Sequence, residues 1–424
     1  MVLKWYSMTL VLAVLLLANL GIKLWLAGRQ ASHVARHRDA VPRAFAGSIS
    51  LEAHQKAADY TLAKSRVAVW DIALDAVLLL GWTLLGGLSL LDQWLMDLMG
   101  PGMLQQLVLV AGFMLITGAL NLPISYYQTF HLEQRFGFNN MTIGLWLSDL
   151  VKSTLVGAVL GMPLVWAVLQ LMGSGGSVWW LWAWALLVAY QLFVMWIAPN
   201  VILPLFNRFT PLQNPDLQAR VEALMARAGF SARGFFVMDG SRRSAHSNAF
   251  FTGFGSAKRV VFFDTLLSQL DADEMEAVLA HELGHFRHRH ILKMMATSFI
   301  VTLLGLAALG WLSQQIWFYS GLGVTPDLTG PHDALALLLF LLVTPLVSFF
   351  VAPLSAARSR RFEFEADAYA MQQADGAQLA SALLKLYEDN ASTLTPDPWY
   401  VSFYYSHPPA VDRLARMPAP AGSL

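Results

Sequence analysis

The sequence predicts a mainly α-helical, polytopic membrane protein that carries a small α+β unit outside the bilayer. Of its 424 residues, 56% are hydrophobic and only 13% are charged, whereas a soluble domain has about 45–50% and about 25%. The second observation is a set of long uncharged tracts, because an apolar stretch of about 20 residues can cross a bilayer as a helix. We therefore expect several membrane crossings.

The composition also excludes several classes of function. The 28 basic and 28 acidic residues cancel, so no bulk positive field exists to attract nucleic acid, and no nucleic-acid partner is expected. The chain contains no Cys, which excludes disulfides, thiolate metal sites and a cysteine nucleophile. A metal ion would have to be held by His, Asp or Glu.

Seven membrane spans account for the uncharged tracts. The longest tract is divided by a segment of Gly and Ser at residues 173–177, which makes two spans of ordinary length. The second span requires Asp71 and Asp75 to face protein rather than lipid, because a charge in hydrocarbon is costly. The expected spans are residues 5–22, 67–91, 98–130, the two parts of 153–207, 294–326 and 334–357.

Basic residues provide an independent test, because short cytoplasmic loops carry an excess of Lys and Arg. Of the 28 basic residues, 26 fall in alternate loops and in the C-terminal tail, and only Lys4 and Lys23 lie elsewhere. This alternation predicts an N-terminus outside and a C-terminus in the cytoplasm. The expected parts are residues 1–207 with five spans, a cytoplasmic loop 208–293, two spans in 294–357 and a cytoplasmic segment 358–424.

The cytoplasmic loop is expected to form a small α+β unit. Its pattern predicts a helix at 217–228, short strands at 234–238 and 260–263, and a second helix that begins near Asp273. Asp271 and Glu274 form a capping-box pattern at the start of this helix. The helix carries too many charges to lie in hydrocarbon, so its motif is expected outside the membrane.

That helix contains His281-Glu282-Leu283-Gly284-His285, the H-E-x-x-H pattern. Histidines four residues apart lie on one face of a helix, so both imidazoles can reach one zinc ion while Glu282 reaches its water as general base. The alternative is a polar surface helix on which histidines cluster without a function. We disfavour it because this pattern rarely arises by chance. We therefore predict one Zn²⁺ per chain.

A catalytic zinc site usually has a third protein ligand and an open fourth position. Two crossings separate residue 293 from residue 358, so the segment that follows the seventh span returns to the face of the first two ligands. Glu363 is the predicted third ligand there. Asp367, one turn later, can accept the free ring N–H of a ligand histidine, which we expect to be His281. Glu365 points elsewhere on the helix and is the less favoured ligand.

Two further histidines, His288 and His290, follow the motif. The longer H-E-x-x-H-x-x-G-x-x-H pattern would need Gly at 288 and His at 291, but the chain has His and Ile. We therefore expect His288 and His290 to be exposed or interfacial, without a role at the metal.

Beyond these motifs, the sequence resembles the CAAX prenyl protease family of multi-pass zinc endopeptidases, which process prenylated precursors. The resemblance covers nearly the whole chain and rests on residues 50–60, 129–139, 239–249 and 406–409 as well as on the two metal motifs. It implies a barrel of seven helices around a large water-filled chamber, with the zinc site facing that chamber.

The resemblance also implies roles for three residues. Asn248 and Ala249 resemble the edge-strand segment with which an extended substrate pairs. His407 resembles the C-terminal histidine that donates a hydrogen bond to the developing oxyanion. Without the resemblance, Asn248 and His407 would be interpreted as ordinary loop and turn residues.

These observations predict a zinc-dependent endopeptidase that hydrolyses peptide bonds near the C-terminus of prenylated CAAX-type or other membrane-associated substrates. A general quality-control protease without prenyl preference remains an alternative, and a non-enzymatic seven-span transporter is a distant one. The expected partners are a peptide or protein substrate and the lipid bilayer. We expect a bacterial inner membrane, or the ER membrane if the source is eukaryotic.

Overall fold

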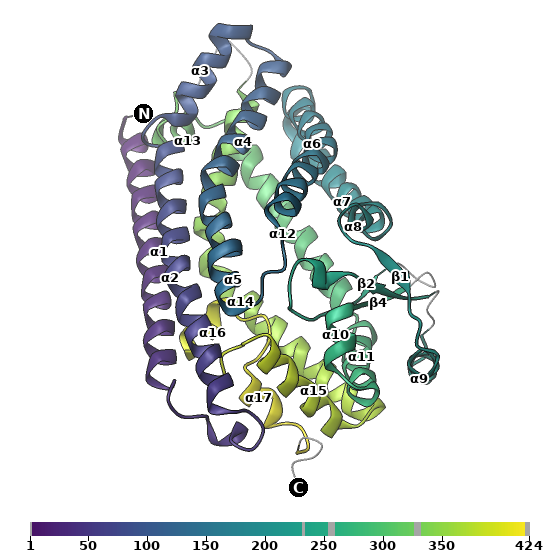
Figure 1. Cartoon of the computed structure of the whole chain (residues 1–424). Coiled ribbons are helices and arrows are strands. Elements are labelled where there is room, and N and C mark those ends of the chain that lie inside the picture. Colours follow the sequence, from purple (N-terminus) through teal and green to yellow (C-terminus); the bar gives the residue numbers. More distant parts are fainter. Residues whose placement is uncertain (1, 231–233, 253–258, 326–331, 420–424) are drawn as a thin grey trace.

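The computed structural model describes residues 2–230, 234–252, 259–325 and 332–419. The described chain forms a bundle of long helices and, at one end of it, a unit that contains a small sheet (Figure 1). The long helices α1, α2, α4, α6, α7, α12 and α14 make up the bundle, and the sheet unit lies at their lower end in that view.

The bundle has the number of membrane helices that the sequence predicts. Six helices are long and apolar enough to cross a membrane, and the number is seven if α2 and α3, bent by 47° at a short break, count as one span. The bundle helices are α1 (Val2–Arg36), α2 (Leu51–Trp82), α3 (Gly87–Met99), α4 (Met103–Tyr127), α5 (Gln134–Phe136), α6 (Ile143–Ser174), α7 (Trp179–Ile197), α8 (Leu203–Phe206), α12 (His290–Leu312), α13 (Ile316–Gly321) and α14 (Asp333–Gln373). The polytopic, mainly α-helical fold is confirmed.

Two helices end earlier than expected. The second span was expected to reach residue 91, but α2 ends at Trp82 in a turn that contains Gly86 with φ of +81°. Only Gly adopts that conformation without strain. The sixth span was expected to reach residue 326, but α12 ends at Leu312, before the polar residues Ser313 and Gln314. The expected spans were bounded by charged residues. Neither turn contains one, so the ends of α2 and α12 were not predicted.

The last span and the helix that carries Glu363 are one continuous element. Helix α14 has 41 residues and passes through the expected boundary between 357 and 358 without a break. Its first half packs in the bundle, and its second half reaches the sheet unit (Figure 1). The segment that carries Glu363 is therefore a direct continuation of a membrane helix.

The sheet has four strands rather than the two expected. They are β1 (Phe209–Pro211), β2 (Phe235–Met238), β3 (Ala249–Thr252) and β4 (Arg259–Phe263), in the order β1-β2-β4-β3. The central pair β2–β4 is parallel, and the outer strands β1 and β3 pair antiparallel to it. Strand β3 therefore lies at an edge, where it leaves one side of its backbone unpaired within the sheet.

Helices pack around this sheet to form a second hydrophobic core. They are α9 (Pro215–Arg227), α10 (Asp264–Gln269), α11 (Ala272–Arg287) and α15 (Gly376–Asp389). Two short helices follow: α16 (Pro398–Tyr404) packs on α1 and α14, and α17 (Ala410–Leu414) packs on α15. Leu224 of α9, Phe262 of β4 and Leu279 of α11 are buried together in this core. The core also includes Ala370 of α14, which fixes the sheet unit to the end of the last membrane helix.

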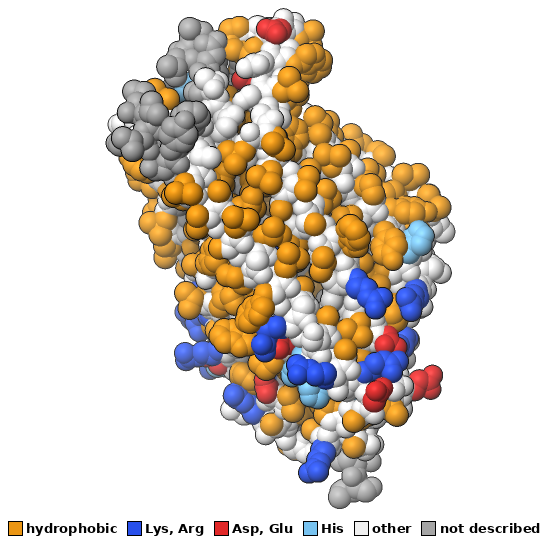
Figure 2. Space-filling view, turned by 90° about the vertical axis from the view of Figure 1, so that its left-hand side faces the viewer, with side chains coloured by type: hydrophobic (Ala, Val, Ile, Leu, Met, Phe, Trp, Pro, Cys, Tyr) orange, Lys and Arg blue, Asp and Glu red, His pale blue; other side chains and the backbone are white. Residues whose placement is uncertain are grey.

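Surface charge separates the two ends of the molecule. Figure 2 shows hydrophobic side chains over most of one flank, whereas Lys, Arg and most Asp and Glu side chains gather at the lower end. This band of apolar surface is what a lipid-facing bundle requires, and the charged end is suited to water.

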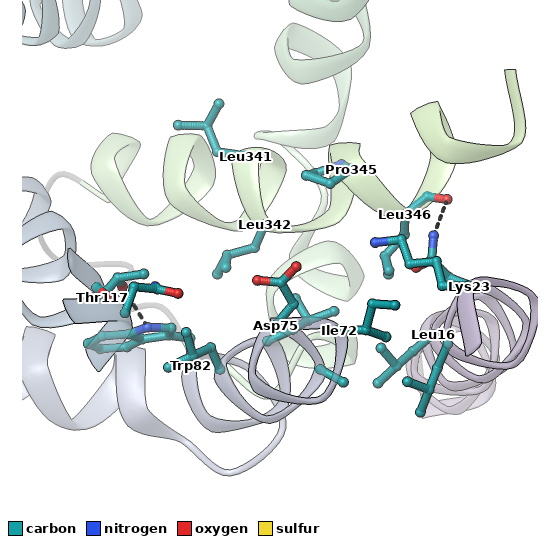
Figure 3. Close-up of a pocket in the computed structure, with 16 residues that line it drawn as sticks. Leu16, Lys23, Ile72, Asp75, Trp82, Thr117, Leu341, Leu342, Pro345 and Leu346 are labelled. Atoms are coloured by element: carbon teal, nitrogen blue, oxygen red, sulfur yellow. Dashed lines mark hydrogen bonds between the residues drawn. The ribbon is translucent and has the colours of Figure 1, made fainter. Parts of the chain in front are cut away.

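The acidic residues of the second span do face protein. Asp71 accepts a hydrogen bond from Gln128 Nε2 at 3.0 Å. Asp75 lines a cavity of about 230 Å³ between α1, α2, α4 and α14, together with Asn19, Lys23 and Asn121. Figure 3 shows the Asp75 carboxylate pointing into this cavity, while Lys23 approaches it from α1.

Candidate metal centre

Helix α11 positions the two histidines of the H-E-x-x-H motif. The predicted capping box is confirmed: Asp271 Oδ1 accepts from the backbone N–H of Glu274 at 2.9 Å, and Glu274 Oε2 accepts from the backbone N–H of Asp271 at 3.0 Å. One helical turn separates His281 and His285, and their Nε2 atoms lie 3.2 Å apart. The two nitrogens therefore point at a common position.

Glu363 of α14 completes a three-ligand group. Its Oε2 lies 3.4 Å from His281 Nε2, and its Oε1 lies 3.4 Å from His285 Nε2. Two ligand atoms at about 2.0–2.1 Å from a tetrahedral ion are roughly 3.3 Å apart, so the spacing suits a small tetrahedral metal. Glu363 Oε2 is also buried without a hydrogen-bond partner. A cation would satisfy that orphaned oxygen.

The glycine of the motif lets the two helices meet. A Cβ atom on Gly284 would lie 2.8 Å from Ala366 Cα and 3.0 Å from Ala366 O, closer than real Cβ contacts. The backbones of α11 and α14 therefore approach more closely than a larger residue at 284 would permit. This approach brings Glu363 within ligand distance of both histidines.

Asp367 lies where the sequence predicts, and Arg413 joins it. Asp367 Oδ1 lies 2.8 Å from His281 Nδ1. Arg413 Nε donates to Asp367 Oδ2 at 2.8 Å, and Nη2 donates to Oδ1 at 2.5 Å, a bidentate pair. The pair holds Asp367, which accepts from His281 Nδ1–H and leaves the lone pair on Nε2 for the metal.

Arg413 was not found from the sequence. It lies on α17, a helix of five residues near the end of the described chain, and is 6% exposed. No spacing or motif distinguishes it from the other Arg residues of that segment, so no sequence signal could have found it.

The electrostatics of this group concentrate positive charge on His281. Burial by itself lowers the pKa of His281, but the hydrogen bond with Asp367 and the nearby carboxylate of Glu363 outweigh burial and raise the pKa to about 9. Burial also opposes the charge on Arg413, yet the hydrogen bonds to Asp367 raise its pKa. The carboxylates thus create a site for positive charge, which a proton or a metal ion can occupy.

His290 is buried rather than exposed or interfacial, so that expectation was wrong. It is 1% exposed, and its Nδ1 lies 3.0 Å from His285 Nδ1. Its Nε2 lies 3.0 Å from Glu365 Oε2. If His290 Nε2–H donates to Glu365, His290 Nδ1 can accept from His285 Nδ1–H, which leaves His285 Nε2 free for a metal.

Glu365 is not part of the three-ligand group but has partners of its own. It also accepts from Arg361 Nε at 3.0 Å. His288 is only half-buried and stacks on the ring of His290. The chain from Glu365 through His290 to His285 parallels the contact of Asp367 with His281. The distance of His290 from the motif along the sequence did not predict this contact.

Glu282 lies beside the ligands on α11 and is half-buried. It makes no hydrogen bond or ion pair with any residue that the structure describes. Its carboxylate is consequently free to accept a proton from a water molecule in the site.

The remaining predicted residues border a cavity beside the metal ligands. His407 Nε2 lies 3.4 Å from Glu363 Oε1, and its Nδ1 lies 3.0 Å from Ser406 Oγ. His407 and the exposed Asn248 both line a cavity of about 670 Å³. Ala249 is the first residue of the edge strand β3. The structure thus brings all the predicted site residues to one region.

A membrane-spanning bundle that combines H-E-x-x-H with a glutamate from a second helix defines a membrane-embedded metallopeptidase. Residues 30–208 match the family model described as CAAX prenyl protease N-terminal, five membrane helices, and residues 211–421 match Peptidase family M48. The chain belongs to the CAAX prenyl protease family of M48 peptidases.

Individual relatives agree with this assignment. The chain is 36% identical over 395 residues to a CAAX prenyl protease 1 homolog of Arabidopsis thaliana, covering 88% of this chain and 89% of the relative. It is 30% identical over 354 residues to the Homo sapiens homolog, covering 73% of each chain. The crystal structure of S. mikatae Ste24p superposes with a TM-score of 0.90 at 30% identity, covering 96% and 98% of the two chains.

Proposed function

We propose that the chain is a zinc-dependent endopeptidase that hydrolyses peptide bonds near the C-terminus of prenylated CAAX-type or other membrane-associated substrates. The observation that carries the proposal is the convergence of His281, His285 and Glu363 at distances suited to one tetrahedral ion. The donor set of two imidazoles and one carboxylate, without thiolate, is typical of catalytic zinc. The names of the relatives support the substrate class.

The ligand residues would hold the ion, and the neighbouring groups would do the proton transfer. Zinc in such a site lowers the pKa of a water molecule and polarises a carbonyl group. Glu282 would accept the proton of the attacking water and deliver it to the leaving amine. This is hydrolysis without a covalent bond between enzyme and substrate.

Other residues would position the substrate. Asn248 and the backbone of Ala249 at the edge of the sheet would bind an extended peptide by strand addition. His407 would donate a hydrogen bond to the developing oxyanion, and its replacement by Ala should lower kcat by roughly 10². A variant with unchanged kcat and disturbed membrane insertion would contradict this role.

The test is cleavage-site mapping on one peptide in prenylated and unprenylated forms. Wild-type enzyme should cut near the C-terminus, should lose activity to a chelator and should regain it with zinc. Glu282→Gln should retain about one zinc per chain yet be inactive. Glu276→Gln is the control on the same helix: its carboxylate pairs with Arg227 at 2.7 Å and not with the ligand group, so the variant should keep near-wild-type activity. Activity of Glu282→Gln at the wild-type rate would overturn the mechanism.

The same experiment decides between substrate classes. Faster cleavage of the prenylated peptide would support CAAX-type processing. Equal cleavage of both forms would favour the general quality-control protease. If the protein binds no zinc and cleaves neither form, the result would favour the non-enzymatic transporter.

We also propose that the sheet unit and both metal motifs lie on the cytoplasmic side. The grouping of basic side chains at the lower end of the molecule supports this orientation through the positive-inside rule. Protease protection of sealed vesicles would test it. The bacterial origin stays a prediction, which the eukaryotic relatives do not support.

A further inference from the structure

The cavity that borders the metal centre is lined by many hydroxyl and amide side chains, with a few apolar ones. Its lining comes from α2, α15, α16, the segment before β3 and the turn that carries His407. Its described lining residues include neither Asp nor Glu, but they include the hydroxyl groups of Thr61, Ser65 and five tyrosines. A cavity with many hydrogen-bond donors and no carboxylate is suited to a negatively charged group.

Lys64 and Arg413 are the Lys and Arg side chains among the described lining residues, and they differ in availability. Arg413 is buried and already makes its bidentate pair with Asp367. Lys64 is exposed to the cavity and makes no hydrogen bond or ion pair with any described residue. Its Nζ lies 5.0 Å from the ring centroid of Tyr60. Lys64 is therefore a free cation held over an aromatic face.

Glu133, an acidic group that Lys64 attracts, is already engaged elsewhere. Glu133 accepts a hydrogen bond from Tyr60 Oη at 2.6 Å and lies 3.6 Å from His246 Nε2. Lys64 acts on Glu133 only through longer-range attraction. The ammonium group of Lys64 thus remains free to bind an anion that enters the cavity.

The lining residues of α2 present one continuous face to the cavity. Tyr60, Thr61, Lys64, Ser65 and Ala68 follow the spacing of adjacent positions on a helix. His407 lines the same cavity and lies 3.4 Å from the candidate metal ligand Glu363. The cavity lined by Lys64 is therefore also lined by a residue that lies next to a candidate metal ligand.

We infer that Lys64 binds the free α-carboxylate at the C-terminus of the substrate and so selects bonds a short distance before a chain end. This inference rests on the proposed peptidase function. A peptide that ends three residues after the cleaved bond extends about 10 Å beyond it, a length that fits within a cavity of about 670 Å³. The negatively charged chain end would pair with the ammonium group of Lys64, which has no carboxylate partner among the described lining residues.

The experiment compares two peptides that differ only at the chain end, one with a free carboxylate and one with a carboxamide. Both are assayed with purified, zinc-loaded, full-length protein. Wild type should show a kcat/KM that is roughly ten- to a hundredfold higher for the carboxylate, the range for a hydrogen bond to a charged group. Lys64→Gln should reduce that ratio nearly to one, mostly through KM, and Lys64→Arg should restore most of it.

A matched control is available on the same helix. Lys56 of α2 lies over the ring of Phe138 and does not line the cavity. Lys56→Gln, with the same change of charge, should keep the wild-type ratio. Equal loss of activity on both peptides in Lys64→Gln would overturn the inference, because a merely structural lysine would not discriminate between them.

A binding measurement separates this inference from the proposed function. The dissociation constants of both peptides are measured with the zinc-loaded Glu282→Gln variant, with and without Lys64→Gln. Tighter binding of the carboxylate that depends on Lys64 supports the inference even if no cleavage is found. Equal binding of the two peptides overturns it, even if wild type cleaves both. Addition of an anionic phospholipid that abolished the preference would assign the site to lipid phosphate and also overturn it.

Discussion

Charged side chains gather in two regions, the buried metal centre and a cavity in the membrane bundle, and these regions differ in how the charges are paired. At the metal centre, Glu363, Asp367 and Arg413 are only 4%, 3% and 6% exposed. In the membrane bundle, Asp75 faces a cavity and makes no ion pair or hydrogen bond with any described residue. Lys23, in the same cavity, lies 5.5 Å from the ring of Phe349 rather than against Asp75.

The two regions stabilise their charges in different ways. Within the metal centre Asp367 and Arg413 pair directly, and Glu363 lies 3.4 Å from both His281 and His285, so removal of one member leaves buried charge without its neighbour. The membrane cavity, with about 230 Å³, has room for several water molecules that can hydrate Asp75 and Lys23. Substitutions in the first region should therefore have large effects, and substitutions in the second region small ones.

Removal of the third ligand should have the largest effect. Glu363→Ala takes away the only carboxylate of the ligand group and leaves His281 and His285 insufficient for tight binding. We expect loss of bound zinc and a fall in activity of at least about 10³. Elemental analysis of the purified variant checks the first result, and a peptide assay checks the second. Full zinc content would show that another group supplies the third ligand.

Loss of the carboxylate beneath His281 should have the next largest effect. Asp367→Asn keeps the shape but weakens the contacts to His281 Nδ1 and Arg413. Metal affinity should fall roughly 10- to 100-fold, as for other partners of ligand histidines. Competition with a zinc chelator measures the change. Asp412→Asn, on the exposed surface next to Arg413, is the matched control and should keep wild-type affinity.

Separation of the two helices should have a moderate effect. Gly284→Ala introduces a Cβ at 2.8 Å from Ala366 Cα, and such overpacking costs about 1–3 kcal/mol. Ala is favoured over Gly in a helix by only about 1 kcal/mol, so a net loss is expected in the thermal midpoint and in zinc affinity.

Gly305→Ala on α12 is the control for helix propensity. Its Cβ would meet Phe340 Cζ at an ordinary 3.8 Å. It should keep or slightly raise stability. If Gly284→Ala were equally harmless, close approach of α11 and α14 would not be a requirement of the site.

The ligands could be predicted from the sequence because each depends on local spacing and on topology. His281 and His285 are one turn apart, and the count of membrane crossings placed Glu363 on the same side. Asp367 follows Glu363 by one turn on the same helix, so it could be predicted too. These relations require no knowledge of how distant side chains pack.

Arg413 and His290 could not be predicted, because their roles depend on tertiary contacts without a repeat or spacing. Arg413 reaches Asp367 from a short helix 46 residues later in the chain. Arg289 adopts φ of +56°, so the helix is interrupted between α11 and α12, and His290 begins the new helix with its side chain buried. Strands β1 and β3 were missed for a similar reason: each has three or four residues and depends on its neighbour for pairing.

The smallest effect is expected in the membrane cavity. Asp75→Asn removes one charge that has no protein partner, and the cavity retains Asn19, Asn121 and space for water. Stability should change by less than about 1 kcal/mol, as for a hydrated group without a paired charge, and peptidase activity should stay within about twofold. Thermal unfolding in detergent and the peptide assay measure both. A drop in activity of tenfold or more, with zinc content intact, would mean that this cavity takes part in catalysis and that the two regions act together.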